Sequence, residues 1–484
     1  MNEVDMSKNL PKMPLVDAIR AARVGDAAPM QIPGHKWRYR DANDPSAVGF
    51  EFLHDLLRDD IPLQGGADDN AFTGGFLVAA EALYASAIGA SHTRFLVGGS
   101  SQGNIAAFLT VSRDGSRIAV DRTSHRSAIA GLVLSGAMPV WINPTIHPEF
   151  GIPVGMPANA LDSAGDVTAA FVTAPSYVGT ISEISPLAAA AHKAGFPLVV
   201  DQAWGAHLDF GVPGYLNALR QGADVVVTSI HKALLGYTQT ATISINSKLV
   251  DASRLDRCVD TTATTSPSAT LLASIDATRA TLEMDGGAAI DRALTMSAAA
   301  RDRLRQVPGV VVIDESTAGC AVDPLKITLW LTQTGVSGVE LAAALWDLGH
   351  GVENADNDTI AMTVSLADQP QTIAQIIEKT VALIEKLRRQ PRAAMPSAVW
   401  SVRPIVEMTP RAAVFADRHR IPLTKAVGQI SAEQFCPYPP GVPLLGPGEL
   451  VTQELIEAIQ IAGTIGRVAY CSDPTLQTIE VVSQ

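Results

Sequence analysis

Short apolar runs alternate with helix-like stretches through the middle of the chain. The runs are Arg94–Val97, Arg117–Val120, Ala169–Pro175, Pro197–Val200, Ala223–Ser229 and Ala241–Ile245. Strands this uniformly apolar, separated by helices, are typical of a mostly parallel sheet that is covered on both faces. The pattern therefore predicts an α/β fold, in which ligands bind beyond the carboxyl ends of the strands.

Some of the helix-like stretches carry signals at their ends. Ser185 can cap a helix whose first turn suits Pro186, and Gly195 would end that helix. A second unit is expected from about Cys320, with a strand over Leu325–Leu331 followed by a helix that Ser337 caps.

At 484 residues the chain is too long for one ordinary compact core. The stretch Leu387–Pro404 carries prolines and arginines and is interpreted as a connector. It leads to the proline-dense segment Tyr438–Glu449, which cannot form a regular helix and is expected to be a rigid loop. The expected division is an N-terminal segment over 1–45, a large domain over 46–319, a small α/β domain over 320–387 and a C-terminal domain over 388–484.

Composition narrows the class of protein. Hydrophobic residues make up 47% of the chain and charged residues 18%, which excludes a disordered protein. The formal net charge is −13 without a long basic run, so nucleic acid is not an expected partner. The four widely spaced cysteines predict neither a zinc cluster nor a disulfide framework. Since no signal peptide or membrane-spanning stretch is evident, we expect a cytoplasmic location, no membrane partner and no metal.

The apolar run Ala223–Ser229 leads almost directly into His231 and Lys232. Most lysines pack their stem and send the charged head to water. An ammonium ion beside a core strand is costly to desolvate, and burial favours the neutral amine. A neutral amine can form a Schiff base with an aldehyde. Lys232 is therefore a candidate to hold an aldehyde cofactor, of which pyridoxal phosphate is the commonest.

Pyridoxal phosphate needs a carboxylate to pair with its pyridinium nitrogen, and Asp201 meets that demand. Asp201 ends the run Phe196–Asp201, one strand before Lys232. An aspartate at a strand end can instead cap the following turn, so the assignment depends on the pair of residues.

The phosphate of such a cofactor needs a third element. The stretch Gly98–Asn104 places glycines and serines between a strand and an expected helix, where exposed N–H groups and hydroxyls bind phosphate well. A short turn of this kind is a weak signal, but it is not GxGxxG, which argues against a dinucleotide. Ser229 could add a hydroxyl. His125, which follows the strand-like Arg117–Asp121, could stack on a flat heteroaromatic ring.

These elements, in this order, resemble the fold-type I pyridoxal-phosphate enzymes, and more specifically the bacterial ornithine/lysine/arginine decarboxylase family. The resemblance runs from about residue 13 to the C-terminus. The matching segments are QIPGHK, GGSSQGN, DRTSHRS, APSYVGTISEI, VVDQAWGAH, TSIHKALLGYTQTA, TTSPSATLLASIDATR and YPPGVPLLGPGE. The resemblance implies an aspartate aminotransferase-like fold, with a mostly parallel sheet domain and a smaller α+β C-terminal domain.

The resemblance also implies a role for individual residues. Lys232 would hold pyridoxal 5'-phosphate as a Schiff base, and Asp201 would keep its ring nitrogen protonated. His125 and Ala203 would lie on the two faces of the ring, and His231 would position the substrate or return a proton. The phosphate would be held by Ser100, Ser101, Gln102 and Ser229.

In this family the site lies between two subunits, so a homodimer is implied, with Thr264–Ser268 reaching the phosphate site of the partner. The chain starts shortly before Gln31–Lys36, so the short form without an N-terminal wing domain is expected. Two features depart from the family pattern. The loop Asp59–Gly75 lacks the usual histidine, and Trp204 stands where shorter members usually have histidine. The altered loop leaves the substrate open.

The leading hypothesis is decarboxylation of lysine, ornithine or arginine to a diamine or agmatine and CO2, as in polyamine metabolism. A distal amine or guanidinium needs a carboxylate, for which Glu433 is a candidate, although a surface glutamate is an equal alternative. Another fold-type I activity, an aminotransferase or a lyase, would use the same Lys232 and Asp201. A non-catalytic homologue is the third hypothesis, and the intact Lys232, Asp201 and His125 argue against it.

Overall fold

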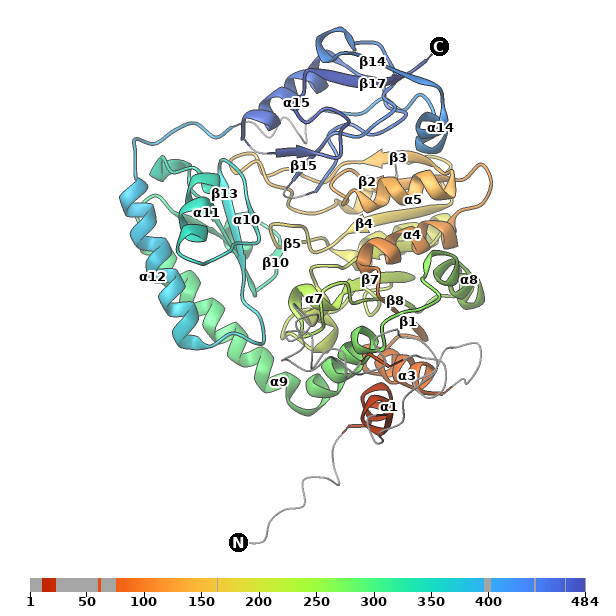
Figure 1. Ribbon diagram of the computed structural model, residues 1–484. Coiled ribbons are helices and arrows are strands. Elements are labelled where there is room, and N and C mark those ends of the chain that lie inside the picture. Colours follow the sequence, from red (N-terminus) through yellow and green to blue (C-terminus); the bar gives the residue numbers. More distant parts are fainter. Residues whose placement is uncertain are drawn as a thin grey trace, which may run out of the picture.

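The computed structural model describes residues 11–22, 60–61, 75–162, 164–395, 402–438, 441–465 and 467–483. The QIPGHK motif at 31–36 and nearly all of the loop at 59–75 lie outside the described residues. The described chain forms a large sheet domain, a small α/β unit and a C-terminal unit (Figure 1).

A seven-stranded sheet forms the centre of the large domain. Its strands are β1 (His92–Leu96), β2 (Arg117–Asp121), β3 (Met138–Ile142), β4 (Ala169–Thr173), β6 (Leu198–Asp201), β7 (Val225–Ser229) and β8 (Ala241–Ile245), in the order β1-β8-β7-β6-β4-β2-β3. The pairs from β7 to β3 are parallel, whereas β8 is antiparallel to both β7 and β1. The predicted mostly parallel sheet is confirmed, and each predicted apolar run overlaps one of its strands.

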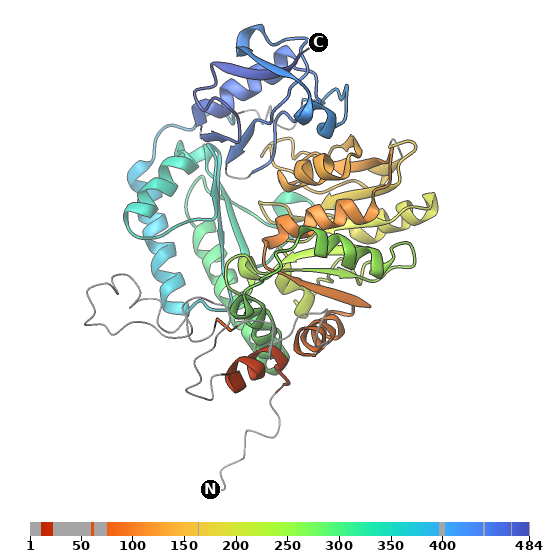
Figure 2. The same cartoon turned by 45° about the vertical axis from the view of Figure 1, so that its right-hand side comes forward.

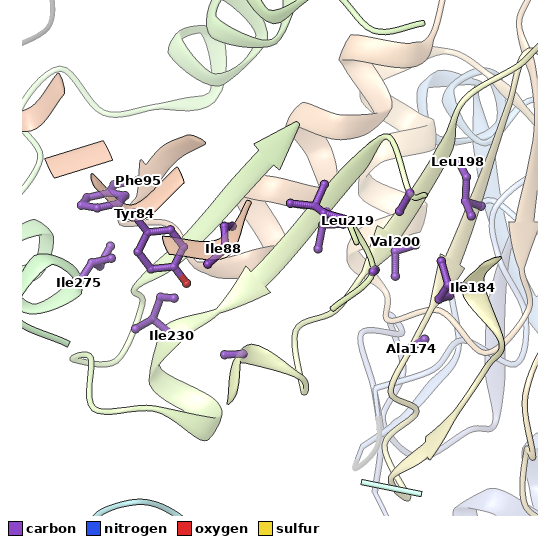
Figure 3. Close-up of a cluster of buried hydrophobic side chains, with 14 of the residues drawn as sticks. Tyr84, Ile88, Phe95, Ala174, Ile184, Leu198, Val200, Leu219, Ile230 and Ile275 are labelled. Carbon is purple, nitrogen blue, oxygen red and sulfur yellow. The ribbon is translucent and has the colours of Figure 1, made fainter. Parts of the chain in front are cut away.

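Helices cover both faces of this sheet, which explains why its strands are apolar throughout. They are α3 (Phe76–Ile88), α4 (Gly99–Val111), α5 (Ser127–Ser135), α6 (Ile184–Ala194) and α8 (Ala252–Thr262). Along β4, Ala170 and Val172 pack in one apolar cluster with Leu187 of α6, part of which Figure 3 shows. The alternate residue Phe171 packs in a second cluster, where its ring stacks on Phe108 of α4 at 4.7 Å between centroids.

The helix after β5 (Thr180–Ile181) starts earlier than its sequence suggests. Glu183 is the N-cap of α6, so Ser185 and Pro186 both lie in the first turn, and the prediction of a Ser185 cap was wrong. Proline is tolerated there because the first N–H groups of a helix have no intrahelical partner. Gly195 ends the helix in the left-handed conformation, at φ 87°, as predicted.

The long helix α9 (Ala269–Arg305) connects the large domain to the small unit, as Figures 1 and 2 show, and α1 (Pro14–Ala22) packs on it. The small unit has a four-stranded antiparallel sheet in the order β12-β13-β11-β9. Its elements are β9 (Val311–Ile313), α10 (Glu315–Ala318), β10 (Ala321–Val322), β11 (Lys326–Trp330), η6 (Thr332–Thr334), α11 (Gly338–Asp347), β12 (Asn354–Ala355), β13 (Thr359–Thr363) and α12 (Pro370–Leu387).

Two expectations for the small unit can be compared with the structure. Ser337 is the N-cap of α11, as predicted. β9, which precedes the expected boundary at residue 320, pairs with β11 in the sheet of the small unit. A short strand such as Val311–Ile313 gives little sequence signal of its own, so its sheet partner decides where it belongs.

The C-terminal unit has its own apolar core, which includes Phe435, Leu445 and Ile459. Its elements are α14 (Pro410–Phe415), β14 (Arg418–Pro422), η7 (Leu423–Lys425), β15 (Cys436–Tyr438), α15 (Gln453–Ile465), β16 (Arg467–Ala469) and β17 (Thr478–Val482). A buried ion pair fastens this unit to the end of β2: Arg122 Nη1 lies 2.9 Å from Glu449 Oε1, and both side chains are almost fully enclosed. The pair brings the proline-rich loop to the carboxyl edge of the large sheet.

Candidate active site

A cavity of about 290 Å³ lies at the carboxyl ends of the parallel strands. Parallel strands end at the same edge of a sheet, and polar residues that follow different strands therefore meet there. The cavity brings together Ser100, Ser101, His125, Asp201, Ala203, His231 and Lys232, all of which the sequence singled out. Its size is near the lower end of the roughly 300–1,000 Å³ typical of small-molecule sites.

Lys232 lies in the short helix α7 (Ile230–Ala233), which begins directly after β7. Burial lowers the pKa of its amine, while the negative charges of Asp201 and Glu353 act in the opposite direction. A lowered pKa increases the fraction of neutral amine, which is the nucleophilic form. The cavity is thus bordered by a lysine amine whose pKa is lowered.

Asp201 is the last residue of β6 and is only 2% exposed. Its Oδ1 accepts a hydrogen bond from the Ala203 N–H at 3.0 Å, and its Oδ2 accepts one from Asn104 Nδ2 at 2.7 Å. Burial raises the pKa of this carboxyl, while the charge of Lys232 lowers it. A buried carboxylate of this kind gains stability from a cation that binds beside it.

His125 is connected to Asp201 by a chain of hydrogen bonds. Its Nδ1 lies 2.9 Å from Ser127 Oγ, and Ser127 Oγ accepts from the same Asn104 amide that binds Asp201. The Ser127 N–H also points to Nδ1, at 3.3 Å, so Nδ1 is the acceptor and Nε2 carries the proton. Burial lowers the pKa of His125 to about 4, and the imidazole is therefore neutral at pH 7.

The start of α4 forms a cradle for an anion. Gly98 is the N-cap of this helix, and the intrahelical bonds begin with the Gln102 N–H, so the N–H groups of Ser100 and Ser101 precede them. A phosphate is a natural ligand for N–H groups at such a helix start. Ser229, the last residue of β7, does not border the cavity; its hydroxyl is fully buried and has no hydrogen-bond partner among the described residues. This orphaned hydroxyl fits a ligand that supplies an acceptor.

His231 borders the cavity beside Lys232. Its Nδ1 lies 2.9 Å from the carbonyl oxygen of Thr240, and a carbonyl only accepts, so Nδ1 must donate. Nε2 is then the nitrogen that can exchange a proton. Burial lowers the pKa of His231, and this imidazole is also mostly neutral at pH 7.

Two further predicted residues do not border the cavity. Gln102 Oε1 accepts a hydrogen bond from the Gly98 N–H at 3.0 Å. Glu433 lies in the C-terminal unit, where its carboxylate accepts from the Ser472 hydroxyl at 3.0 Å and the Glu480 N–H at 2.7 Å. Neither Gln102 nor Glu433 borders the cavity of its own subunit, and their roles stay predictions.

The sequence analysis assigned no role in the site to three further residues, although it quoted the motifs of two of them and named Trp204. Asn104 was part of a quoted motif, yet its hydrogen bond to Asp201 depends on the packing of α4 against the sheet. Trp204 borders the cavity and lies under the amine of Lys232, which is 4.0 Å from the ring centroid. Val442, from the proline-rich loop, also borders the cavity, and the Gly441 carbonyl oxygen accepts from the Arg126 N–H at 2.9 Å. The quoted YPPGVP motif was the available signal for Val442.

The fold and the site define the class of protein: an aspartate aminotransferase-like, fold-type I enzyme, with a lysine and an aspartate at the ends of neighbouring parallel strands. The ornithine/lysine/arginine decarboxylase family models match residues 13–319, as the major domain, and residues 393–467, as the C-terminal domain. The chain therefore belongs to the ornithine/lysine/arginine decarboxylase family, and it is an amino-acid decarboxylase.

Individual relatives agree with this assignment. An arginine decarboxylase of Halalkalibacterium halodurans is 30% identical over 97% of this chain and 98% of its own length. An arginine decarboxylase of Bacillus subtilis is 30% identical over 92% of each chain. Among solved structures, lysine decarboxylase A from Pseudomonas aeruginosa has a TM-score of 0.80 at 20% identity and covers 98% of this chain and 80% of its own. A serine palmitoyltransferase of Sphingomonas wittichii has a TM-score of 0.52 at 18% identity, over 64% of this chain and 77% of its own.

Three further observations concern groups outside the cavity. The four cysteines all lie among the described residues and form no disulfide bond with one another. No helix among the described residues is long and apolar enough to cross a membrane. In the same part of the chain, no cluster of three or more histidine, cysteine, aspartate or glutamate side chains could hold a metal ion.

Proposed function

We propose that this protein uses pyridoxal 5'-phosphate, held covalently through Lys232, to decarboxylate a basic amino acid to CO2 and a diamine or agmatine. The observation that carries the proposal is that Lys232, Asp201 and His125, which follow three different strands, border one cavity. Arginine is the substrate we expect, because the arginine decarboxylases named above are 30% identical, whereas the lysine decarboxylase LdcA of Pseudomonas aeruginosa is 23% identical.

The residues of the cavity fit this cofactor. When bound, pyridoxal phosphate supplies an electron sink for the electron pair that remains when the carboxylate leaves. The buried Asp201 carboxylate would accept a hydrogen bond from a protonated ring nitrogen, and its two existing bonds keep it oriented. Ser100, Ser101 and the orphaned hydroxyl of Ser229 would hold the phosphate.

Three residues would act on the cofactor ring and the substrate: two would pack on the faces of the ring, and one would return a proton to the reacting carbon. A neutral imidazole at position 125 adds no positive charge beside the ring, which suits stacking, and Ala203 would pack on the opposite face. His231 would deliver a proton from Nε2 to the reacting carbon, because its Nδ1 is committed to Thr240. Because its pKa is lowered, a protonated His231 gives up its proton more readily than an ordinary imidazolium does.

We also propose a homodimer with the site at the subunit interface. Thr238 and Gln239 border the cavity, and the neighbouring Leu235 and Tyr237 are 42% and 48% exposed, a pair of large apolar side chains beside the site. The segment Thr264–Ser268 is largely exposed in the single chain and would be available to a partner. Light scattering of the purified protein tests this part, and a monomeric mass would contradict it.

The test of the activity is product analysis. Purified protein with added pyridoxal phosphate should release CO2 from arginine and form agmatine. Formation of cadaverine from lysine, or of putrescine from ornithine, would support decarboxylation but identify a substrate other than arginine. A requirement for a keto-acid acceptor would show an aminotransferase instead. Cofactor binding without turnover of any of these amino acids would support a non-catalytic homologue.

A further inference from the structure

A second buried lysine contacts Trp204, which borders the cavity. Lys326 is the first residue of β11 in the small unit and is 2% exposed. Its Nζ lies 3.8 Å from the ring centroid of Trp204, and Lys232 Nζ lies 4.0 Å from the same centroid. The two amines are therefore no more than about 8 Å apart and share one indole ring.

The surroundings of Lys326 keep this amine in place. Its Nζ donates a hydrogen bond to Thr363 Oγ1 at 3.1 Å. Its stem lies against Gly179, where an added Cβ would come within 2.8 Å of Lys326 Cβ, so a side chain at 179 would displace the lysine. Glycine at position 179 therefore leaves the room that the side chain of Lys326 occupies.

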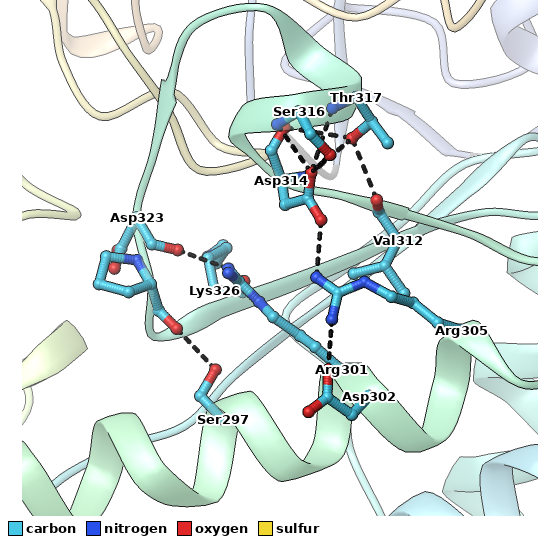
Figure 4. A network of polar contacts seen from close by, with 11 residues as sticks. Ser297, Arg301, Asp302, Arg305, Val312, Asp314, Ser316, Thr317, Asp323 and Lys326 are labelled. Atoms are coloured by element: carbon cyan, nitrogen blue, oxygen red, sulfur yellow. Dashed lines mark hydrogen bonds and ion pairs between the residues drawn. The ribbon is translucent and has the colours of Figure 1, made fainter.

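The residues just before Lys326 are also bonded to the residues just after Trp204. Asp323 Oδ1 lies 2.9 Å from His207 Nε2, and both of these side chains are buried. Arg301 of α9 donates to the carbonyl oxygens of Asp323 and Lys326, as Figure 4 shows. The position of the ammonium over the indole is therefore fixed by several independent contacts.

This arrangement is unfavourable for an ordinary structural lysine. Two like charges share a region of low dielectric constant, where each disfavours the other. Burial lowers the pKa of Lys326 to about 8; the negative charges of Glu353 and Asp323 raise it, and Lys232 lowers it further. Buried charges are usually paired directly or replaced by apolar residues. The contact of the Lys326 ammonium with the Trp204 ring therefore indicates that this charge has a functional role.

We propose that Lys326 is a positioning residue of the reaction: its ammonium holds Trp204 in the cavity wall by a cation–π contact, and it places a positive charge near the nitrogen of Lys232. This inference rests on the proposed role of Lys232. The charge favours the unprotonated form of the Lys232 nitrogen. The contact with Trp204 keeps the wall in place when Lys232 Nζ leaves the indole to bond with the cofactor.

Three holoenzyme variants test the proposal. Lys326→Met keeps the stem and removes the charge, Lys326→Arg keeps the charge, and Lys379→Met removes an exposed lysine of α12 as a matched control. The readout is the pH midpoint of the visible absorption of the bound cofactor, which reports protonation of the Lys232 nitrogen. Loss of a unit charge at about 8 Å should raise that midpoint by roughly one pH unit in Lys326→Met. The Arg variant and the control should stay near the parent value.

A kinetic readout separates positioning from simple stability. A displaced Trp204 should lower kcat of Lys326→Met by about 10- to 100-fold, with the amino-acid KM changed much less. An unchanged midpoint in Lys326→Met, or the same shift in the Met and Arg variants, would overturn the proposal. Should Lys326→Met not fold, Lys326→Gln, which is also uncharged, provides the same titration. Failure of the proposed function looks different: the parent protein itself would then carry no cofactor on Lys232.

Discussion

Asn104 Nδ2 donates a hydrogen bond to Asp201 Oδ2 at 2.7 Å, which ties the helix of the anion cradle to the carboxylate that would face the cofactor ring. The same amide donates to Ser127 Oγ at 2.9 Å, and Ser127 contacts His125. One buried side chain therefore orients two groups on which the proposed chemistry depends.

Replacing Asn104 by leucine should disturb both groups at once. The substitution leaves Asp201 Oδ2 and Ser127 Oγ without their donor, which should lower the free energy of unfolding by about 1–3 kcal/mol. Cofactor affinity should fall by roughly tenfold, because Asp201 is no longer held. Urea unfolding and a cofactor titration measure the two effects. Asn159→Ala, at an exposed position of η4 (Ala158–Leu161), should change neither. Parent-like cofactor affinity in Asn104→Leu would contradict this role.

Gly103 allows α4 to approach the sheet closely. A Cβ at this position would lie 2.6 Å from Val227 Cγ1 and 3.0 Å from Leu96 Cδ1. Gly103→Ala should therefore push the start of α4 away from β7, separate Ser100 and Ser101 from Ser229, and cost about 1–3 kcal/mol of stability. We expect a weaker affinity for pyridoxal phosphate, measured by equilibrium titration.

Gly287→Ala is the matched control for Gly103→Ala. Gly287 lies in the helix α9, is exposed, and has no atom within 4 Å of an added Cβ. Alanine should stabilise this helix by up to about 1 kcal/mol. If Gly103→Ala and Gly287→Ala bound the cofactor equally well, close packing of α4 would not be what shapes the cradle.

The buried pair between Arg122 and Glu449 should hold the C-terminal unit against the large domain. Arg122→Met leaves the buried Glu449 carboxylate without its cation and should destabilise the protein by about 3–5 kcal/mol. The double variant Arg122→Met with Glu449→Leu removes both charges and should recover part of that loss. Limited proteolysis near the C-terminal unit and urea unfolding check both. A double variant that is less stable than Arg122→Met would contradict the explanation.

His125 gives the ligand-free protein a definite dependence on pH. Its pKa is about 4 in the folded protein and about 6.5 when unfolded, so the unfolded chain binds a proton more readily. The stability that this residue contributes is complete above about pH 6.5 and is lost as the pH falls toward 4, by up to about 3 kcal/mol. His125→Phe removes this pH-dependent contribution to the free energy of unfolding. The difference in unfolding free energy between parent and variant should therefore shrink or reverse on acidification, and a constant difference would refute the assignment.

The main candidate residues of the site could be predicted from the sequence because they come at the ends of predicted strands. Asp201 and Lys232 each come at the end of a strongly apolar run, and parallel strands bring such ends to the same edge. Aspartate and lysine are rarely buried for structural reasons alone. Their occurrence at the ends of two apolar runs therefore indicated a functional site. The large sheet followed from the same apolar runs.

The remaining parts of the site depend on contacts that a local pattern does not encode. Lys326 reaches Trp204 from another unit of the chain, and only the packing of the two loops reveals the contact. Gln102 fulfils the local pattern of a phosphate ligand, yet its amide oxygen accepts a hydrogen bond from the nearby Gly98 N–H. Glu433 likewise satisfies neighbouring backbone and hydroxyl donors. In both cases a short local hydrogen bond competes with the predicted function.

The measurement that tests the central claim most directly is borohydride reduction of the purified, yellow protein, followed by peptide mass spectrometry. The account predicts one pyridoxyl adduct per chain, on the peptide that contains Lys232, and no adduct in Lys232→Ala. An adduct on Lys326 or on any other lysine of the parent protein, or a Lys232→Ala protein that is still labelled, would contradict it.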